Sequence, residues 1–419
     1  MKSLIFSLIM VLGTVSTLGA QNLQKSTIKL TFAEGKDRLL AENVKLLAEY
    51  YNIEVAEAQV EQARLWNNPY FIWNAEMYNF AKNTYFQMNN QILVQIEYVF
   101  SVTGKRINAI KQANLSKEIA SLAFNDVVRG LIAEYSNAYY TLNELQEKEA
   151  IYQKTIAQFQ DVIELSELKL KLGVSSENDL IRLKTEYLSL NSVLNAIKNE
   201  RIKTESELKT MLNLGGDVNL ETQKVNYKIA NNLNATYLLD SAKVYRPDVK
   251  MAEKNIQLNE LIYKGQKKLA YPDMKLGYQP FDKGSNHVRP YAGMVFELDL
   301  PIFNRNQGNI SAARVQIEQS KHMFNYVSKE LENQINAAYF NLINVKNTHA
   351  QFTDDMLQKM DELSINAKAN YEKRNISLLE YIDHQRAYVE NKMNWIEANT
   401  QFYQSINTIH FVVGKEIAF

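Results

Sequence analysis

The sequence predicts a mainly α-helical protein with a small β part, built as two internal repeats that each run helix, β-hairpin, long helix, helix. Long proline-free stretches carry apolar residues at helical spacing, and stretches of alternating polarity interrupt them. The two halves also superpose at an offset of 200 to 203. Pro69 then matches Pro272, Glu97 matches Glu297, and Gly173 falls on Asn375, which indicates an internal duplication.

The clearest alternating stretch begins at Arg289. Five apolar residues alternate there with five others that include two carboxylates: Ala292, Met294, Phe296, Leu298 and Leu300 against Tyr291, Gly293, Val295, Glu297 and Asp299. This pattern predicts a strand with one apolar and one wet face. From Asn304 to Arg374 about seventy residues without proline then predict one continuous helix.

Composition excludes several classes of function. The 419 residues include 47 basic and 47 acidic side chains and no cysteine, so disulfides, thiolate metal sites and thiol nucleophiles are absent and a nucleic-acid partner is disfavoured. The five histidines show no i, i+4 pairing: His287, His322, His349, His384 and His410. We therefore expect no metal site, no cofactor and no catalytic residue.

Residues 1–20 have the features of a signal peptide. A lysine precedes an apolar run that ends in small residues, which predicts cleavage after Ala20. Because no cysteine follows, we expect no lipid anchor on an N-terminal thioether. No later apolar run approaches the roughly 18 residues that a membrane-spanning helix needs. Any membrane insertion must then use strands.

The first repeat covers residues 21–214. A short polar lead precedes a helix from Phe32 to Trp66, and strands follow over about 69–102, from Tyr70 to Phe80 and from Asn90 to Ser101. Residues 81–89 are expected to form an exposed loop. Residues 103–214 then predict an antiparallel helical hairpin that turns at Gly173.

The second repeat covers residues 246–419, after a linker at 215–245. Arg246-Pro247-Asp248 opens a helix, strands lie at about 271–302 with a loop at 280–290, and a helical hairpin occupies 304–413. A long helix of about 70 residues would span roughly 105 Å, so we expect an elongated molecule. Four strands cannot close a barrel, whereas a trimer would supply twelve strands and a ring of helical hairpins.

The residues resemble the TolC-type outer-membrane efflux proteins. The duplicated layout, Arg246-Pro247-Asp248 and the run LPIFNRNQGNI from Leu300 to Ile310 carry the resemblance over nearly the whole mature chain. That run, with VTGKR at 102–106, is most similar to the heavy-metal and cation-efflux branch of the CzcC and CusC kind. The resemblance implies a trimeric outer-membrane β-barrel of twelve strands, continued by a periplasmic α-helical barrel.

The resemblance also implies a passive exit duct and its partners. A periplasmic membrane-fusion adaptor would dock on the duct and link it to an inner-membrane pump of the RND type. The docking tips would be the two hairpin turns: Gly173, Val174, Ser175 and Ser176, with Asn375, Ile376, Ser377 and Leu378. An equally simple interpretation is that Gly173 and Asn375 only permit a left-handed turn between helices.

Glu380 and Asp383 follow the second tip on one helix face and align with the acidic pair that constricts the periplasmic entrance in a relative. Threefold symmetry would make them rings of carboxylates that favour cations, and Arg374 could pair with a neighbouring chain to keep the entrance shut. The alternative is an ordinary solvated helix face.

Strand parity predicts which residues face the barrel lumen: Gln91, Gln95, Glu97, Glu297 and Asp299. These could instead be strand ends wetted by the periplasm. Trp73, Tyr98 and Tyr291 are expected in interfacial belts, and Tyr139 and Tyr339 in the helical wall.

The predicted function is an efflux exit duct that exports heavy-metal cations. A duct of the same architecture for drugs or for type I protein secretion is an alternative, because selectivity resides in the pump and the adaptor. A periplasmic coiled-coil scaffold or adaptor without a pore is an alternative of another class. The amphipathic strands count against that scaffold.

Overall fold

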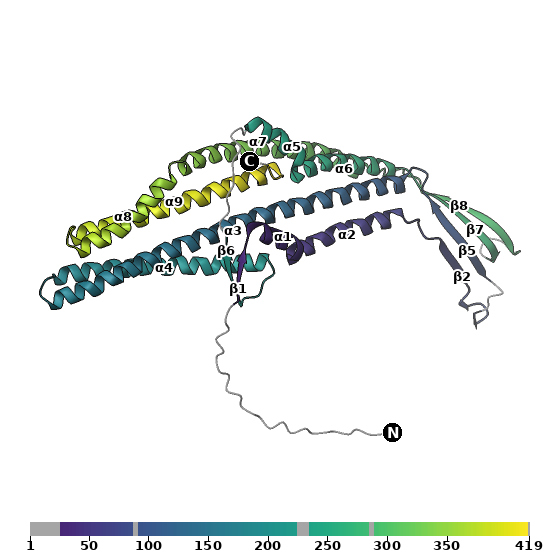
Figure 1. Ribbon diagram of the computed structural model, residues 1–419. Coiled ribbons are helices and arrows are strands. Elements are labelled where there is room, and N and C mark those ends of the chain that lie inside the picture. Colours follow the sequence, from purple (N-terminus) through teal and green to yellow (C-terminus); the bar gives the residue numbers. More distant parts are fainter. Residues whose placement is uncertain (1–25, 87–90, 224–233, 285–288, 418–419) are drawn as a thin grey trace, which may run out of the picture.

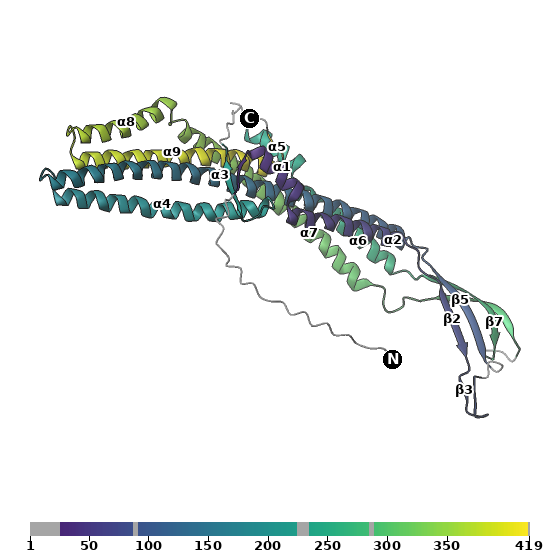
Figure 2. The ribbon, with the colours of Figure 1, turned by 60° about the horizontal axis from the view of Figure 1, so that its bottom comes forward.

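The computed structural model describes residues 26–86, 91–223, 234–284 and 289–417, and the predicted signal peptide lies outside them. The molecule is elongated, with a sheet at one end and two helix turns at the other (Figure 1). Along this axis the helices of the first repeat form one layer and those of the second repeat form another. Figure 2, turned by 60°, shows α8 and α9 above α3 and α4 at the end with the helix turns, and α6 and α7 alongside α2 toward the sheet.

The helices and strands of the first repeat run from Ser26 to Met211. They are β1 (Ser26–Leu30), α1 (Phe32–Glu42), α2 (Val44–Arg64), β2 (Tyr70–Ala75), β3 (Tyr78–Asn79), β4 (Thr84–Tyr85), β5 (Ile92–Phe100), α3 (Lys105–Lys171) and α4 (Glu177–Met211). Since α3 has 67 residues, it is about 100 Å long.

The other helices and strands, which belong to the linker and the second repeat, begin at Val218. They are β6 (Val218–Thr222), α5 (Ala235–Tyr245), α6 (Pro247–Leu269), β7 (Met274–Lys283), β8 (Tyr291–Leu298), α7 (Gln307–His349), α8 (Asp354–Glu372) and α9 (Leu378–Val413). The predicted linker thus contains a strand and a helix, and β6 pairs in parallel with β1 in the predicted polar lead. The division at 21–214, 215–245 and 246–419 stays a proposal.

Two helices predicted as continuous are broken, so those predictions were wrong. The helix over 32–66 stops at Asn43, whose side chain caps the next helix by accepting from the Leu46 N–H at 2.8 Å and also donates to the Met211 carbonyl. The helix predicted from Asn304 to Arg374 is interrupted at 350–353, where the Thr353 hydroxyl caps α8 by accepting from the Met356 N–H. A side-chain cap favours a new start over continuation.

Strand ends also differ from the predictions. The first strand stops at Ala75 rather than Phe80. The short strand β3 then occupies the end of that predicted strand and pairs with β4 inside the predicted loop, of which residues 87–89 lie outside the described part. At the same end of the sheet β7 runs on to Lys283, into the loop predicted at 280–290. Register shifts at Val94/Ile96 and at Gln279/Asp282 let the strand pass Pro280.

Three apolar clusters hold the helices together. One joins α5, α7 and α9, one joins β1, α1, α3, α4 and β6, and one joins the turn ends of α3, α4, α8 and α9. Tyr139 is fully buried in the second cluster and donates to the Leu30 carbonyl at 2.9 Å, while Tyr339 packs against the first. Both tyrosines lie in the helical wall, as predicted.

Candidate functional site

The four-stranded sheet exposes its apolar face. The strands run in the order β2-β5-β7-β8, all antiparallel, and their register places Trp73, Ile96, Tyr98, Leu276, Tyr278, Met294, Phe296 and Leu298 on one face. Phe296 is 61% exposed and Met294 is 82% exposed. A sheet in a water-soluble protein buries such an apolar face. The exposed apolar face of this sheet is therefore suited to an apolar solvent.

The opposite face of the sheet is polar and more buried. Gln95 and Glu97 are 6% and 7% exposed, Gln95 donates to Glu97, and Gln279 donates to the Gln95 side-chain oxygen at 2.8 Å. Near the helical end of the sheet Lys275 forms an ion pair with Glu297 at 3.2 Å. Gln95, Glu97 and Glu297 therefore share one face, as their parity predicted.

Two glycines make room on this polar face. A Cβ at Gly277 would lie 3.0 Å from Cγ of Glu97, and one at Gly293 would lie 3.2 Å from the Tyr291 ring. Gln91 and Asp299 lie just beyond the ends of β5 and β8 and are exposed. Their positions fit the alternative of wetted strand ends at least as well as a place in a lumen.

Sequence reasoning missed two polar residues on this face, Gln279 and Asp282. Because Met274, Leu276 and Tyr278 share the apolar face, the alternation of the strand already indicated that Gln279 lies on the polar face. Asp282 is fully buried and accepts a hydrogen bond from the Tyr291 hydroxyl at 2.9 Å. Tyr291 thus lies on the polar face, which corrects its predicted place in an interfacial belt, whereas Trp73 and Tyr98 lie on the apolar face.

The two hairpin turns lie at the same end of the molecule (Figure 1). Each closes with the same C-cap bond, from the Val174 N–H to the Lys169 carbonyl and from the Asn375 N–H to the Asn370 carbonyl, both at 2.8 Å. The left-handed residue is Gly173 in the first turn, but Arg374 rather than Asn375 in the second. The repeats therefore match at this point with an offset of 201, one residue less than the alignment predicted.

The eight tip residues divide into exposed and structural ones. Gly173, Val174 and Asn375 are exposed, and Ser176 and Ser377 cap α4 and α9 through their hydroxyls. Ser175 and Ile376 are half-buried, and Leu378 is buried in the apolar cluster below the turns. The turns thus present a small outer surface on a fixed apolar base.

Glu380 has a structural role that sequence reasoning missed. Its carboxylate accepts from the Ser377 N–H at 2.7 Å and from its hydroxyl at 2.9 Å, while the hydroxyl accepts from the Glu380 N–H at 3.3 Å. These hydrogen bonds hold the pKa of Glu380 below its usual value. The Ser-x-x-Glu spacing was the available signal. Asp383, three residues on, is exposed, as is Arg374.

The Arg-Pro-Asp motif joins three helices. Pro247 opens α6, and Arg246, 4% exposed, donates to the Asp248 carboxylate and, at 2.6 Å, to Gln334 of α7. Burial favours the neutral acid at Asp248, but hydrogen bonds from Arg246 and the charge of Arg129 of α3 outweigh it and lower the Asp248 pKa. The motif therefore anchors the second repeat to the first.

The two junctions between sheet and long helix share one conformation. Gly104 and Asn306 are the N-cap residues of α3 and α7, and both are left-handed, with φ of 69° and 58°. Each is tied to the end of α6, since Lys268 donates to the Gly104 carbonyl at 3.0 Å and Asn306 donates to the Gln266 carbonyl at 2.8 Å. These contacts account for the glycine of VTGKR and an asparagine of LPIFNRNQGNI.

The described residues bring together no group of three or more histidine, aspartate or glutamate side chains that could hold a metal ion. His349 stacks on Phe402 and bonds to Asn399, and His410 bonds to the Ile417 carbonyl. His287 lies outside the described residues. No helix among the described residues is long and apolar enough to cross a membrane.

Comparison with known proteins gives a consistent result. The model of the family described as outer membrane efflux protein matches residues 36–214. The cobalt-zinc-cadmium resistance protein CzcC of Cupriavidus metallidurans is 21% identical over 378 residues, which cover 89% of this chain and 87% of CzcC.

Solved structures share the fold. CusC superposes with a TM-score of 0.72 at 16% identity, covering 92% of both chains. VceC of Vibrio cholerae gives 0.73 at 14% identity, covering 92% of this chain and 96% of VceC. A membrane protein of Pseudomonas aeruginosa gives 0.75 at 17% identity, covering 96% and 97%.

Proposed function

We propose that this chain, a member of the outer membrane efflux protein family, is the exit duct through which a tripartite efflux system passes its substrate out of the cell. The observation that carries the proposal is the sheet with one exposed apolar face and one polar face. In the outer membrane the apolar face contacts lipid and the polar face contacts water. A duct of this kind performs no chemical reaction.

Oligomerisation follows from the open edges of the sheet. Within the described part of the chain β2 and β8 each have an unpaired side, and unpaired backbone groups are costly in lipid. Three chains supply twelve strands, which suffices for a closed barrel. We therefore propose a homotrimer whose helical hairpins continue the barrel as a tube, about 100 Å long by the length of α3, into the periplasm.

Three sets of residues receive roles in this trimer. Gln95, Glu97 and Glu297 line the lumen of the barrel, together with the strand-end residues Gln91 and Asp299. Glu380 and Asp383 form carboxylate rings at the periplasmic entrance, where Arg374 meets a neighbouring chain. The exposed tips around Gly173 and Asn375 bind a membrane-fusion adaptor, which connects the duct to an inner-membrane pump of the RND type.

We propose heavy-metal cations as the cargo. The similarity to a cobalt-zinc-cadmium resistance protein supports this choice, and so do the carboxylates at the proposed entrance and lumen, which attract cations. The duct needs no metal site of its own, because a tight site would slow release.

The location and assembly are tested by fractionation and gel migration. We expect the protein in the outer-membrane fraction, as a trimer in detergent that dissociates on heating. A soluble monomer would contradict the duct and favour a periplasmic scaffold.

The cargo is tested by growth of a deletion strain and its complemented control. We expect sensitivity to graded zinc, cobalt, cadmium, copper or silver and none to detergents, bile salts or dyes. Sensitivity to organic compounds alone would overturn the metal assignment while leaving the duct intact.

A further inference from the structure

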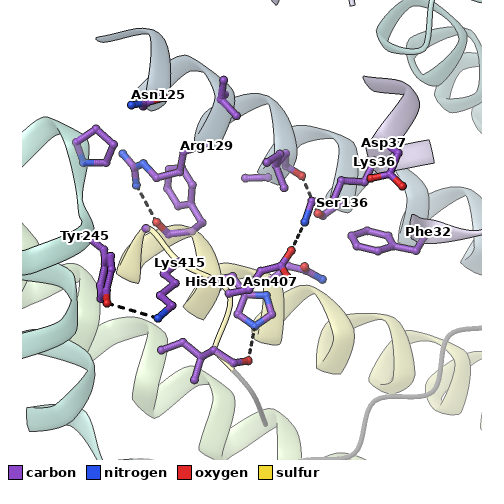
Figure 3. A pocket seen from close by; sticks show the side chains of 18 of the residues that line it. Phe32, Lys36, Asp37, Asn125, Arg129, Ser136, Tyr245, Asn407, His410 and Lys415 are labelled. Atoms are coloured by element: carbon purple, nitrogen blue, oxygen red, sulfur yellow. Dashed lines mark hydrogen bonds and ion pairs between the residues drawn. The ribbon is translucent and has the colours of Figure 1, made fainter. Parts of the chain in front are cut away.

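A large open cavity lies between the two repeats (Figure 3). The elements that line it, α1, α3, the α5–α6 junction and the end of α9, meet near mid-length of the molecule, away from the sheet (Figure 1). The first repeat contributes α1 and α3 to its wall, and the second contributes the α5–α6 junction, the end of α9 and residues 414–417. Its volume is about 1030 Å³. Pockets for small organic molecules measure about 300–1,000 Å³, so the cavity can hold a ligand of that class.

One part of the wall is apolar and aromatic. Phe32, Ile132 and Phe411 contribute hydrophobic surface. Phe411 is held in place because Arg129 stacks 4.2 Å above its ring and donates to its carbonyl at 2.8 Å. His410 bonds to the Ile417 carbonyl at 3.1 Å and so fixes the segment that closes one side. An apolar ligand body would find a fixed surface.

The charged side chains around the cavity leave positive charge unbalanced. Lys36 pairs with Glu416, and Arg129 pairs with Asp126 at 2.6 Å. Lys250, Lys415 and Asp37 also line the cavity, and among the described residues none of the three forms an ion pair, so one positive charge remains in excess.

Lys415 is oriented by an aromatic neighbour. Its ammonium lies 3.5 Å from the Tyr245 hydroxyl and 4.6 Å from the centre of that ring, and Figure 3 shows the two side chains pointing toward each other. Lys250 is half-buried one turn beyond Arg246. A half-buried ammonium without a carboxylate partner favours binding of an anion.

We propose that this cavity is a binding site for a small organic anion, in which Lys250 and Lys415 hold the carboxylate and the apolar body lies on Phe32 and Ile132. An aromatic carboxylate is the simplest member of this class. The ligand contacts both repeats, so its binding stabilises the folded chain. None of its lining residues is among those proposed for the barrel lumen, the entrance or the tips, and the proposal does not depend on them.

Isothermal titration calorimetry on the full-length protein in lipid nanodiscs tests the charge requirement. We expect saturable binding of 2-naphthoate and at least about tenfold weaker binding of the isosteric neutral 2-naphthamide, because the amide loses its charge-assisted hydrogen bonds. No saturable binding of the naphthoate, or equal binding of the amide, would overturn the proposal.

Paired variants locate the site. Lys250→Met with Lys415→Met should weaken naphthoate binding about tenfold, while Lys254→Met should leave it unchanged. Lys254 is the matched control, since it lies one turn further along α6, outside the cavity, and pairs with Glu118 at 2.7 Å. Circular dichroism checks that each variant is folded. Unchanged binding in the double variant, or equal loss in the control, would place the ligand elsewhere.

Discussion

The two helical hairpins occupy the same place in their repeats but are built differently. In the first, α3 runs unbroken for 67 residues and packs on α4 through buried apolar residues such as Phe159, Val162 and Leu183. In the second, the helix before the turn breaks at 350–353, and α8 meets α9 through apolar contacts near the turn and through buried polar side chains further from it.

The second hairpin contains buried hydrogen bonds between α8 and α9. Ser364 and Gln385 are both buried and bond to each other at 3.0 Å, and Asp361 accepts from Tyr388 at 2.8 Å and from Lys392 at 2.7 Å. Hydrogen bonds can be exchanged for water when helices separate, whereas apolar contacts cannot. We therefore expect the second hairpin to open more readily than the first.

The largest effect should come from the apolar interface. Leu183→Ala removes a fully buried side chain between α3 and α4 and should lower the free energy of unfolding by about 2–5 kcal/mol. Ile181→Ala, on an exposed face of the same helix, should change it by less than about 0.5 kcal/mol. Urea unfolding in detergent measures both. Equal effects would mean that α4 is not anchored as described.

A smaller loss is expected in the polar interface. Lys392→Met leaves the Asp361 carboxylate with the Tyr388 hydroxyl and with access to water, so the cost should be about 1–3 kcal/mol. Hydrogen exchange should localise the change to α8 and the first half of α9. A loss as large as that of Leu183→Ala would remove the distinction between the hairpins.

Acid should loosen the second hairpin first. Burial acts to raise the pKa of Asp361, but hydrogen bonds from Lys392 and Tyr388 hold it below its ordinary value of 3.8. Its contribution to stability is therefore complete above pH 3.8 and is lost as the pH falls through the lower folded-state pKa.

Trp395, whose ring lies 5.8 Å from the Lys392 ammonium, reports this change by fluorescence once Trp66 and Trp73 are replaced by Phe. The transition should lie below pH 3.8 and be absent in Asp361→Asn. A transition that survives in Asp361→Asn would assign the acid response to another group.

The smallest structural effect should come from Glu380→Gln. Glutamine keeps an oxygen that accepts from Ser377, so the melting temperature should not change, whereas Glu380→Ala removes the cap and should lower it. Both variants should weaken cation preference in planar bilayers if the carboxylate lines the entrance. Unchanged preference in Glu380→Gln would leave Glu380 with the capping role alone.

Features with a local signal were predictable from the sequence. Alternation in 291–300 predicted both faces of β8, and apolar residues at helical spacing predicted the hairpin of α3 and α4. The break before α8 also had a signal, because Thr353 precedes two aspartates, yet the absence of proline outweighed it. The left-handed Arg374 was missed because asparagine is the commoner residue in that conformation.

Features that join distant segments had no local signal. The pairing of β1 with β6 joins Ile28 to Leu220, and the bond from Arg246 to Gln334 spans 88 residues. The cavity is lined by four separate segments, so the sequence alone could not bring Lys36 beside Glu416. Sequence patterns describe single helices and strands, whereas these contacts depend on how the two repeats pack together.

Single-channel recording of the purified full-length protein in a planar lipid bilayer tests the duct most directly. We expect discrete conductance steps that prefer cations, because the polar face of the sheet would enclose a water-filled lumen containing Glu97 and Glu297. A protein that inserts into the bilayer but conducts no ions under any condition that opens the entrance, including Glu380→Gln with Asp383→Asn, would contradict the proposed duct.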